Sequence, residues 1–413
     1  MEAFKPYQTR MQNPEFVMIE MFGGHNNLSA FVHEDLQEVA AGIKGSKITL
    51  LGLAAIANKP ATVVEVTPEN GIQLVETLGQ VDTGDPEVLE KFLVRALLTY
   101  PDARKAIGFW DHGSGVFDET DSQEKILSRQ INSVERGDRS RSFPARHLFF
   151  PKSRLVNEPE ARGMLHDDTT GGVLTNLEAG AMLSSALKEA GVTDKVDLIF
   201  SDTCLNGMIE VLDEIGQHAK CIVASSDLEP GDGWDYNLWL SKTAKSSPET
   251  AEAWGAQAVD AFRESYESSP KKFPCTLAAF KSDHQITPAF AALIEAARKE
   301  GGFETFFFLD HARSKSQSFA QRDTYDLRDF ADKVRAITQG NKPAMAAAAA
   351  DLITVFDDAK VNSCALGKSV AQSNGLSFYF PASRSQMNRD IATYERLSFS
   401  RNSGWADFLK EFR

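Results

Sequence analysis

Short runs of apolar residues alternate along the chain with longer stretches in which apolar residues recur every three or four positions. The short runs are typical of buried strands, and the longer stretches are typical of amphipathic helices. This alternation predicts an α/β fold in which helices flank a mostly parallel sheet. The predicted strands are residues 16–21, 48–54, 106–110, 196–202, 221–226, 275–280 and 376–380. The predicted helices are residues 28–41, 86–98, 177–190, 205–216, 248–266, 288–300, 327–339 and 343–356.

The helical pattern dominates the last third of the chain. Its run AMAAAAADLI reflects helix propensity rather than low complexity. We therefore predict a sheet-containing domain over residues 14–285 and a helix-rich C-terminal region over residues 286–413 that packs on it.

Residues 118–170 interrupt this rhythm, because they show no clear period and are rich in Gly, Ser, Asp and Arg. Residues 124–154 alone hold eight Lys or Arg. A polar connection of this length inside a compact domain is usually functional or mobile. This segment is therefore a basic insertion in an otherwise acidic protein.

The composition is that of an ordinary globular protein, with 42% hydrophobic and 25% charged residues. The formal net charge of −14 argues against a general binder of nucleic acid or of anionic membranes. A basic partner suits such a surface, although solubility alone also explains it. The sequence does not indicate an oligomeric state.

The N-terminal residues carry no apolar signal segment, and no stretch approaches the roughly 20 apolar residues of a membrane span. We therefore expect a cytoplasmic protein, or a secreted one if a leader has been removed. The four cysteines are too few and too scattered for a disulfide framework, and they show no zinc-ligand spacing.

Two predicted strands end in residues that can carry chemistry. The first ends in KAIGFWDHGSG, which places His112 and Gly113 in a tight turn. The second ends in KVDLIFSDTCLNGMIEV, which places Asp202 and Cys204 just before a predicted helix. Ligands of open parallel sheets bind beyond the carboxyl ends of the strands. We therefore expect His112 and Cys204 to share one cleft.

A cysteine and a histidine at such an edge form a nucleophile and its acid/base partner. A free thiol is mostly protonated at neutral pH, since its ordinary pKa is about 8.5. A helix N-terminus directly after Cys204 and a nearby imidazole would favour the thiolate. The backbone N–H groups of Gly113 and Cys204 are the natural donors for the oxyanion of an acyl-transfer reaction.

Several blocks of the chain together resemble one peptidase family. They are FWDHGSG, DLIFSDTCLNGMIEV about ninety residues later, ASSDLEPGDGWDYNLWL, GGHNNLSAFVHEDLQEV, VDTGDPEVLEKFLVRALLTYPDARKAIGFWDHG, TYDLRDFADKV and GLSFYFP. These blocks resemble the clostripain family of caspase-like cysteine peptidases over most of the chain. His25 departs from the pattern, since Asp is more usual there.

The resemblance implies a caspase-like sheet, a His112 and Cys204 dyad, and cleavage after Arg or Lys through a thioester intermediate. It also implies an acidic substrate pocket, with Asp202 as its acid and Asp232 as a second acid. Each carboxylate could hold a substrate cation through charge-assisted hydrogen bonds. Asp202 could instead cap the following helix, and Asp232 could be an ordinary turn residue. Trp234 either lines the pocket or packs in the core.

Members of this family resemble zymogens that cut themselves between the His and Cys blocks. The basic insertion lies at that place, so it either contains autoprocessing sites or is a solvated loop. The candidate autoprocessing sites are Lys125, Arg129, Arg136, Arg139 and Arg141.

No cofactor or metal site is expected. Asp118, Glu119, Asp121 and Glu124 could attract calcium, and the family includes calcium-dependent members. Because no EF-hand pattern is present, a solvated acidic run is the better interpretation.

The partners of such a peptidase would be proteins or peptides with Arg or Lys at the cleavage site. Two other functions are alternatives to it. One is a catalytically inactive caspase-like protein that binds basic segments without cutting them. The other is an unrelated metal-dependent hydrolase or phosphatase that uses Asp111 and Asp202. The presence of both His112 and Cys204 favours the peptidase.

Overall fold

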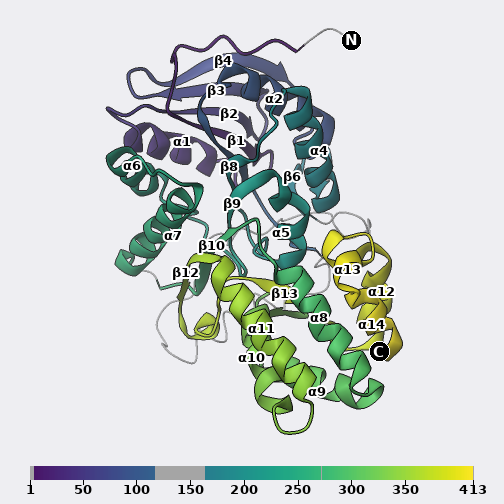
Figure 1. The fold of residues 1–413 in the computed structure, drawn as a ribbon. Coiled ribbons are helices and arrows are strands. Elements are labelled where there is room, and N and C mark those ends of the chain that lie inside the picture. The colour runs from purple at the N-terminus through teal and green to yellow at the C-terminus, as the bar shows by residue number, and fades with distance from the viewer. Residues whose placement is uncertain (1–3, 117–162, 271, 413) are drawn as a thin grey trace.

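The computed structural model describes residues 4–116, 163–270 and 272–412, and a nine-stranded sheet forms its centre (Figure 1). The strands lie in the order β12-β10-β9-β8-β5-β1-β2-β3-β4. Their bounds are β1 (Phe16–Gly24), β2 (Ile48–Ile56), β3 (Ala61–Thr67), β4 (Gly71–Gly79), β5 (Arg104–Trp110), β8 (Val196–Asp202), β9 (Ala219–Ala224), β10 (Cys275–Lys281) and β12 (Lys360–Leu366).

The five central strands β9, β8, β5, β1 and β2 are parallel, whereas the outer strands on both sides are antiparallel. In the register of the sheet, Trp110 at the end of β5 pairs with Phe22 of β1 and with Asp202 of β8. The carboxyl ends of these three strands therefore meet at one edge, as the predicted fold class requires.

Each face of the sheet is buried under its own layer of helices (Figure 1). Alternate residues of β1 point to opposite layers, with Met18 and Phe22 in one cluster and Ile19 and Met21 in the other. One face is covered by α1 (Phe31–Gly42), α6 (Tyr236–Ser246) and α7 (Ala251–Ser268). The other face is covered by α2 (Pro86–Thr99), α4 (Asn176–Glu189), α5 (Ile209–Ile215), α8 (Ile286–Lys299) and α11 (Pro343–Ala359).

The C-terminal region is rich in helices, as the sequence predicts. Besides α8 and α11 it contains α9 (Gly302–Lys315), α10 (Leu327–Thr338), α12 (Arg384–Tyr394), α13 (Ser398–Ser403), α14 (Trp405–Phe412) and η3 (Lys368–Val370). It also contributes β12 to the main sheet and forms a small sheet from β11 (Thr324–Asp326) and β13 (Ser377–Tyr379). The boundary at residue 285 stays a prediction.

The remaining short elements connect the layers. Strands β6 (Gly163–His166) and β7 (Val173–Thr175) form a two-stranded sheet, and η2 (Gly216–His218) precedes β9. The predicted strand at residues 376–380 is not part of the main sheet, because β13 pairs only with β11. The helix predicted from residue 205 begins only at Ile209.

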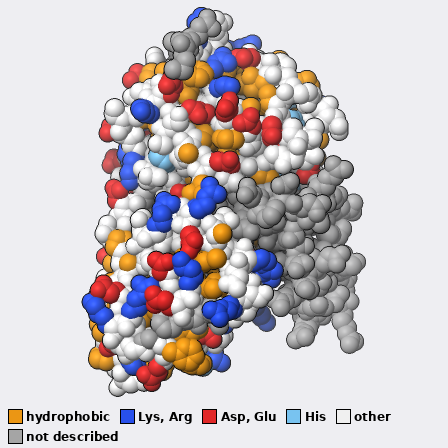
Figure 2. Space-filling view, turned by 90° about the vertical axis from the view of Figure 1, so that its right-hand side faces the viewer, with side chains coloured by type: hydrophobic (Ala, Val, Ile, Leu, Met, Phe, Trp, Pro, Cys, Tyr) orange, Lys and Arg blue, Asp and Glu red, His pale blue; other side chains and the backbone are white. Residues whose placement is uncertain are grey.

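Acidic and basic side chains are interspersed over the face shown in Figure 2, without a basic stripe on its described part. Two exposed aromatic side chains, Phe303 and Phe307, stand out on α9 with 63% and 59% of their surface accessible. Among the described helices, not one combines the length and the apolar character that a membrane crossing requires.

Candidate active site

His112 and Cys204 follow the paired ends of two neighbouring strands. Trp110 of β5 lies opposite Asp202 of β8, and the Asp111 N–H donates to the Asp202 carbonyl at 3.3 Å. His112 and Cys204 each come two residues after this pair, so both turns start from the same level of the sheet. The sheet register therefore brings the two predicted motifs together.

Gly113 lies directly against the turn that carries Cys204. A Cβ atom at Gly113 would come within 2.3 Å of the Cys204 carbonyl oxygen and 2.8 Å of the Thr203 hydroxyl oxygen. No side chain fits at that distance. The His112 and Cys204 side chains are both fully buried in this structure.

Asn27 orients the His112 ring. The His112 Nε2 atom lies 2.8 Å from the Asn27 Oδ1 atom. An amide oxygen only accepts hydrogen bonds, so this contact places the proton of a neutral ring on Nε2. The Nδ1 atom is then the ring nitrogen that can take up and release a proton.

Asp111 holds the turn that carries His112 through hydrogen bonds of its own. Its carboxylate accepts from the Asn26 side-chain amide at 2.6 Å and from the backbone N–H of His166. Burial raises the pKa of Asp111 well above its ordinary value. Because Asp111 alternates with Asp202 across the sheet faces, the two carboxylates point into different layers.

This arrangement does not support the metal-dependent hydrolase. Asp111 and Asp202 cannot ligate one ion from opposite faces of a sheet. Within residues 4–116, 163–270 and 272–412, no three His, Cys, Asp or Glu side chains are grouped as metal ligands.

Two further histidines lie at the same edge. The ring of His166 is 6.4 Å from that of His112, and burial lowers the pKa of His166 to about 4. His25 is buried and lies 2.8 Å from the Asp167 carboxylate, a hydrogen bond that raises the pKa of His25. The His25 contact ties the end of β1 to the loop after β6.

The environment of Cys204 differs from the prediction. No helix begins directly after it, because residues 203–208 form a loop in which Leu205 has a φ angle of 65°. The prediction that a helix N-terminus favours the thiolate is therefore wrong. The backbone N–H of Glu229 lies 3.2 Å from the Cys204 sulfur instead, and it can stabilise negative charge there.

Asp202 is buried on the face covered by α1, α6 and α7. Its Oδ2 atom accepts from the Tyr236 hydroxyl at 3.0 Å and the Trp234 backbone N–H at 3.4 Å. Burial raises the pKa of Asp202 to about 6. The N-cap residue of α5 is Met208, so Asp202 does not cap that helix.

Glu229 joins Asp202 in the interior and was missed by the sequence analysis. Its Oε2 atom accepts from the Trp234 indole N–H at 3.2 Å, and its side chain hydrogen-bonds with Asp202. Burial, and secondarily the Asp202 charge, raise the pKa of Glu229 well above its ordinary value. The Trp234 ring itself packs against both Phe200 and Trp239.

Asp232 occupies a different environment. It is exposed in a turn that the Gly233 N–H closes onto the Pro230 carbonyl at 3.0 Å. The turn interpretation therefore describes its local structure. None of the contacts found among the described residues joins the Asp232 carboxylate to Asp202.

The candidate autoprocessing sites are not part of the described chain. Lys125, Arg129, Arg136, Arg139 and Arg141 all lie outside the described residues, as do the four acids considered for calcium.

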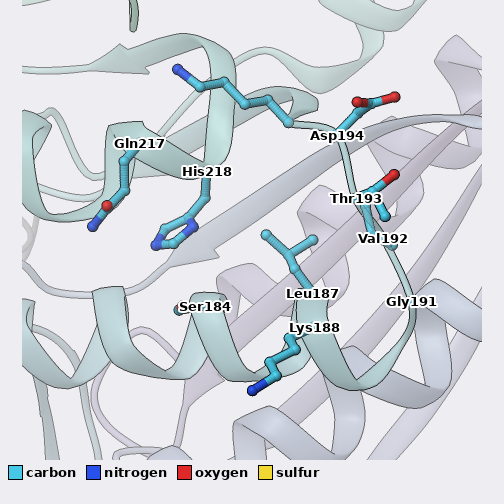
Figure 3. Close-up of a pocket in the computed structure, with 10 residues that line it drawn as sticks. Ser184, Leu187, Lys188, Gly191, Val192, Thr193, Asp194, Gln217 and His218 are labelled. Carbon is cyan, nitrogen blue, oxygen red and sulfur yellow. The ribbon is translucent and has the colours of Figure 1, made fainter.

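A surface pocket at the other end of the central strands is separate from this site (Figure 3). It is lined by the end of α4, the loop before β8 and the η2 turn before β9, and it includes Lys188, Asp194 and His218. Because Val196 and Ala219 begin β8 and β9, the pocket faces the amino ends of these strands. Cys204 follows the carboxyl end.

Comparison with known proteins gives a family match. The sequence model described as "Clostripain family" (peptidase C11) matches residues 21–134 and 154–412. No curated protein matches the chain.

Solved structures share the fold at low sequence identity. An inactive zymogen C11 protease from Parabacteroides distasonis has a TM-score of 0.64 and 15% identity, over 96% of this chain and 99% of its own. A secreted C11 cysteine protease from Bacteroides thetaiotaomicron, bound to an irreversible peptide inhibitor, has a TM-score of 0.63 and 15% identity, over 95% and 99%. A structure of a secreted C11 cysteine protease from the same organism, called iotapain, has a TM-score of 0.67 and 12% identity, over 95% of this chain and 100% of its own.

Proposed function

This chain belongs to the clostripain family of cysteine peptidases, and we propose that it is an endopeptidase that cleaves after Arg or Lys with Cys204 as nucleophile and His112 as acid and base. It is a hydrolase that acts on peptides or proteins. The observation that carries the proposal is the packing of Gly113 on the Cys204 carbonyl, which supports a shared site for the two motifs.

The first half of the reaction forms a thioester. The Cys204 thiol gives its proton to His112, and the sulfur attacks the scissile carbonyl carbon. The backbone N–H groups of Gly113 and Cys204 hold the oxyanion, and each such donor accelerates acyl transfer by about 10²- to 10³-fold. His112 then donates its proton to the leaving amine, and the C–N bond breaks.

The second half releases the acid product. His112 takes a proton from water as the water oxygen attacks the thioester carbonyl carbon. The C–S bond breaks and the sulfur regains its proton. Proton transfer of this kind contributes about 10²- to 10⁴-fold, and the Asn27 contact with Nε2 supports Nδ1 as the atom that carries it.

The basic preference rests on the buried carboxylate of Asp202. A guanidinium or ammonium group beside it would form a charge-assisted hydrogen bond away from bulk water. Asp202 is two residues before Cys204, which puts the pocket next to the nucleophile. Asp232 remains a proposed second acid that would have to reach the substrate from its exposed turn.

Both catalytic side chains are fully buried, so a substrate cannot reach Cys204 without a change in structure. This supports a precursor that is activated by cleavage. We keep Lys125, Arg129, Arg136, Arg139 and Arg141 as the proposed autoprocessing sites. The mechanism uses no metal, and a chelator should leave turnover unchanged. A cytoplasmic location stays a prediction.

The test is turnover of matched fluorogenic peptides that end in Arg, Lys, Asp or Leu. We expect the wild type to cleave the Arg and Lys peptides and to form two fragments on a gel. Cys204→Ala should lower turnover by at least about 10³-fold. The matched control is Cys221→Ala, since Cys221 is another buried cysteine and lies on strand β9.

Two outcomes would contradict the proposal. Turnover of the Asp peptide alone would remove the role of Asp202. If none of the four peptides is turned over, even after the chain has been cut within residues 118–170, the result would favour the inactive binding protein.

A further inference from the structure

Two buried carboxyl groups, those of Asp202 and Glu229, lie next to each other near the candidate nucleophile. Asp202 comes from the end of β8, and Glu229 comes from the loop after β9. Trp234 contacts both, since its backbone N–H donates to Asp202 at 3.4 Å and its indole N–H donates to Glu229 at 3.2 Å. The Glu229 backbone N–H donates to the Cys204 sulfur at 3.2 Å. The backbone of Glu229 thus contacts the reacting atom.

One oxygen of each carboxyl group has no hydrogen-bond donor among the described residues. Asp202 Oδ1 and Glu229 Oε1 are both buried, and no N–H or O–H group of the described residues donates to either. The two side chains are in hydrogen-bonding contact, so two ionised carboxylates would repel each other, and each would have an oxygen without a donor. A single shared proton satisfies both oxygens, so one acid is neutral in this structure.

The hydrogen bonds indicate which acid is ionised. The Tyr236 hydroxyl lies 3.0 Å from Asp202 and 2.7 Å from Glu20, and it has one proton to donate. Burial raises the pKa of Glu20 and Glu229 well above the ordinary value, but that of Asp202 only to about 6. Asp202 accepts hydrogen bonds from Trp234 and Tyr236, whereas Glu229 accepts one from Trp234, so the negative charge rests on Asp202 and Glu229 is the neutral donor.

Among the described residues, the main charge effects on this pair come from groups other than Lys and Arg. The side chains with the largest charge effects on Asp202, Glu229 and the Tyr residues beside them are acids, thiols and phenols. They are Glu20 of β1, Asp35 of α1, Asp232, Tyr236 of α6, Tyr266 of α7, Cys275 of β10 and Cys364 of β12. The charge of Glu38 on α1 also raises the pKa of Asp35. A cationic ligand would supply the balancing charge.

We propose that Glu229 is a second specificity-determining carboxyl group, which binds the Arg or Lys side chain of the substrate together with Asp202. This inference rests on the proposed function. When the substrate cation arrives, the Glu229 carboxyl loses the shared proton to solvent. The two carboxylates then hold one guanidinium or ammonium group between them.

The kinetic test uses Glu229→Gln, which keeps the volume and an N–H donor for Asp202 but cannot ionise. We expect kcat/KM for the Arg and Lys peptides to fall by about 10- to 100-fold, the worth of one buried charge-assisted hydrogen bond. The Leu peptide should change by less than about threefold. The control is Glu65→Gln, since Glu65 is a buried glutamate on β3 away from this site.

The pH profile separates this role from a structural one. In the wild type, the ratio of kcat/KM for Arg over Leu should keep rising as the pH is raised above about 6, because the cation site gains its second charge there. In Glu229→Gln, the ratio should level off once Asp202 is ionised. An unchanged ratio, or an equal fall for all peptides with a lower melting temperature, would overturn the inference.

Two further measurements cover the remaining outcomes. If Glu229→Gln does not fold, calorimetry of benzamidine binding to the wild type in buffers of different ionisation enthalpy decides the question. Release of about one proton supports the inference, and release of none overturns it.

If no peptide is turned over through Cys204, the proposed function fails, and infrared spectroscopy tests Glu229 by itself. The carbonyl band of a protonated carboxyl group near pH 8 should weaken in Glu229→Gln and not in Glu65→Gln. An unchanged band would overturn the inference.

Discussion

Gly113 leaves no room for a side chain where the turns that carry His112 and Cys204 meet. Its hypothetical Cβ atom would lie 2.3 Å from a backbone oxygen, which cannot rotate away as a side chain could. Any larger residue must push the two turns apart. Because the Gly113 N–H is a proposed oxyanion donor, such a shift acts on catalysis as well as on packing.

We expect Gly113→Ala to lower kcat by at least about 10²-fold and to destabilise the fold by about 1–3 kcal/mol. The matched control is Gly340→Ala, since no atom lies within 4 Å of a Cβ at Gly340. That control should keep full activity. Steady-state kinetics and thermal unfolding measure both effects, and an active Gly113→Ala enzyme would contradict the proposed oxyanion site.

The sequence predicted His112 and Cys204 because each follows an apolar strand directly. It did not predict Glu229, which is twenty-five residues after Cys204 with no pattern that links the two. Only the parallel pairing of β8 and β9 brings them together. Asn27 was missed for the same reason, since its contact with His112 spans the ends of β1 and β5.

At the scale of elements, the C-terminal strand β13 holds the loop that carries Cys204. The Ser377 N–H donates to the Gly207 carbonyl at 2.8 Å. On the adjacent helix α5, the Glu210 carboxylate accepts from the Tyr379 N–H and the Tyr394 hydroxyl, both at 2.8 Å. Glu210 thus connects the nucleophile loop to β13 and α12.

Glu210 makes this connection pH-dependent. Burial raises its pKa from 4.5 to about 7, so the folded chain binds the proton more tightly than the unfolded chain does. Its contribution to stability is fully present below pH 4.5 and is lost as the pH rises through about 7. Relative to Glu210→Gln, the wild type should lose about 3 kcal/mol of unfolding free energy over this range.

Urea unfolding of both proteins at several pH values measures this difference. Groups common to both chains cancel in the comparison. The exposed Glu189→Gln is the control for removal of one carboxylate and should follow the wild type. Parallel profiles for wild type and Glu210→Gln would contradict the assigned role.

The elements that the sequence did not predict have identifiable reasons. Strand β4 lies at the sheet edge and is only partly buried, so it lacks the apolar run of an inner strand. The helix expected after Cys204 is delayed because the Gly207 N–H pairs with the Ser225 carbonyl in the neighbouring loop. In contrast, α2 has Asp85 as its N-cap and Pro86 in its first turn, and its predicted start was correct.

At the scale of the whole molecule, the C-terminal region completes the core of the sheet. Strand β12 covers the edge of β10, and Phe356 of α11 packs on Phe280 of β10 with ring centroids 5.3 Å apart. Without this region, apolar side chains of β10 and α5 would face water.

We therefore expect a chain that ends at residue 285 not to fold, because it exposes an open strand edge and a large apolar surface. Circular dichroism and size-exclusion chromatography of residues 1–285 test this. A monomeric product with cooperative unfolding would instead establish the predicted catalytic domain as an independent unit.

The general architecture could be predicted because its central strands are buried on both faces and therefore read as continuous apolar runs. The sequence could not predict which residues that lie far apart along the chain meet in the interior of the protein. The acids Glu20, Asp202 and Glu229 come from three strands or loops and meet only once the sheet has formed.

The central claim is most directly tested by the site of covalent labelling with a peptidyl chloromethyl ketone that ends in Arg. After the chain has been cut within residues 118–170, mass spectrometry of the labelled wild type should find one adduct, on Cys204, and none on Cys221, Cys275 or Cys364. His112→Ala should be labelled far more slowly, and a matched Leu ketone should label poorly. An adduct on another cysteine, or equal labelling by the Arg and Leu ketones, would contradict the account.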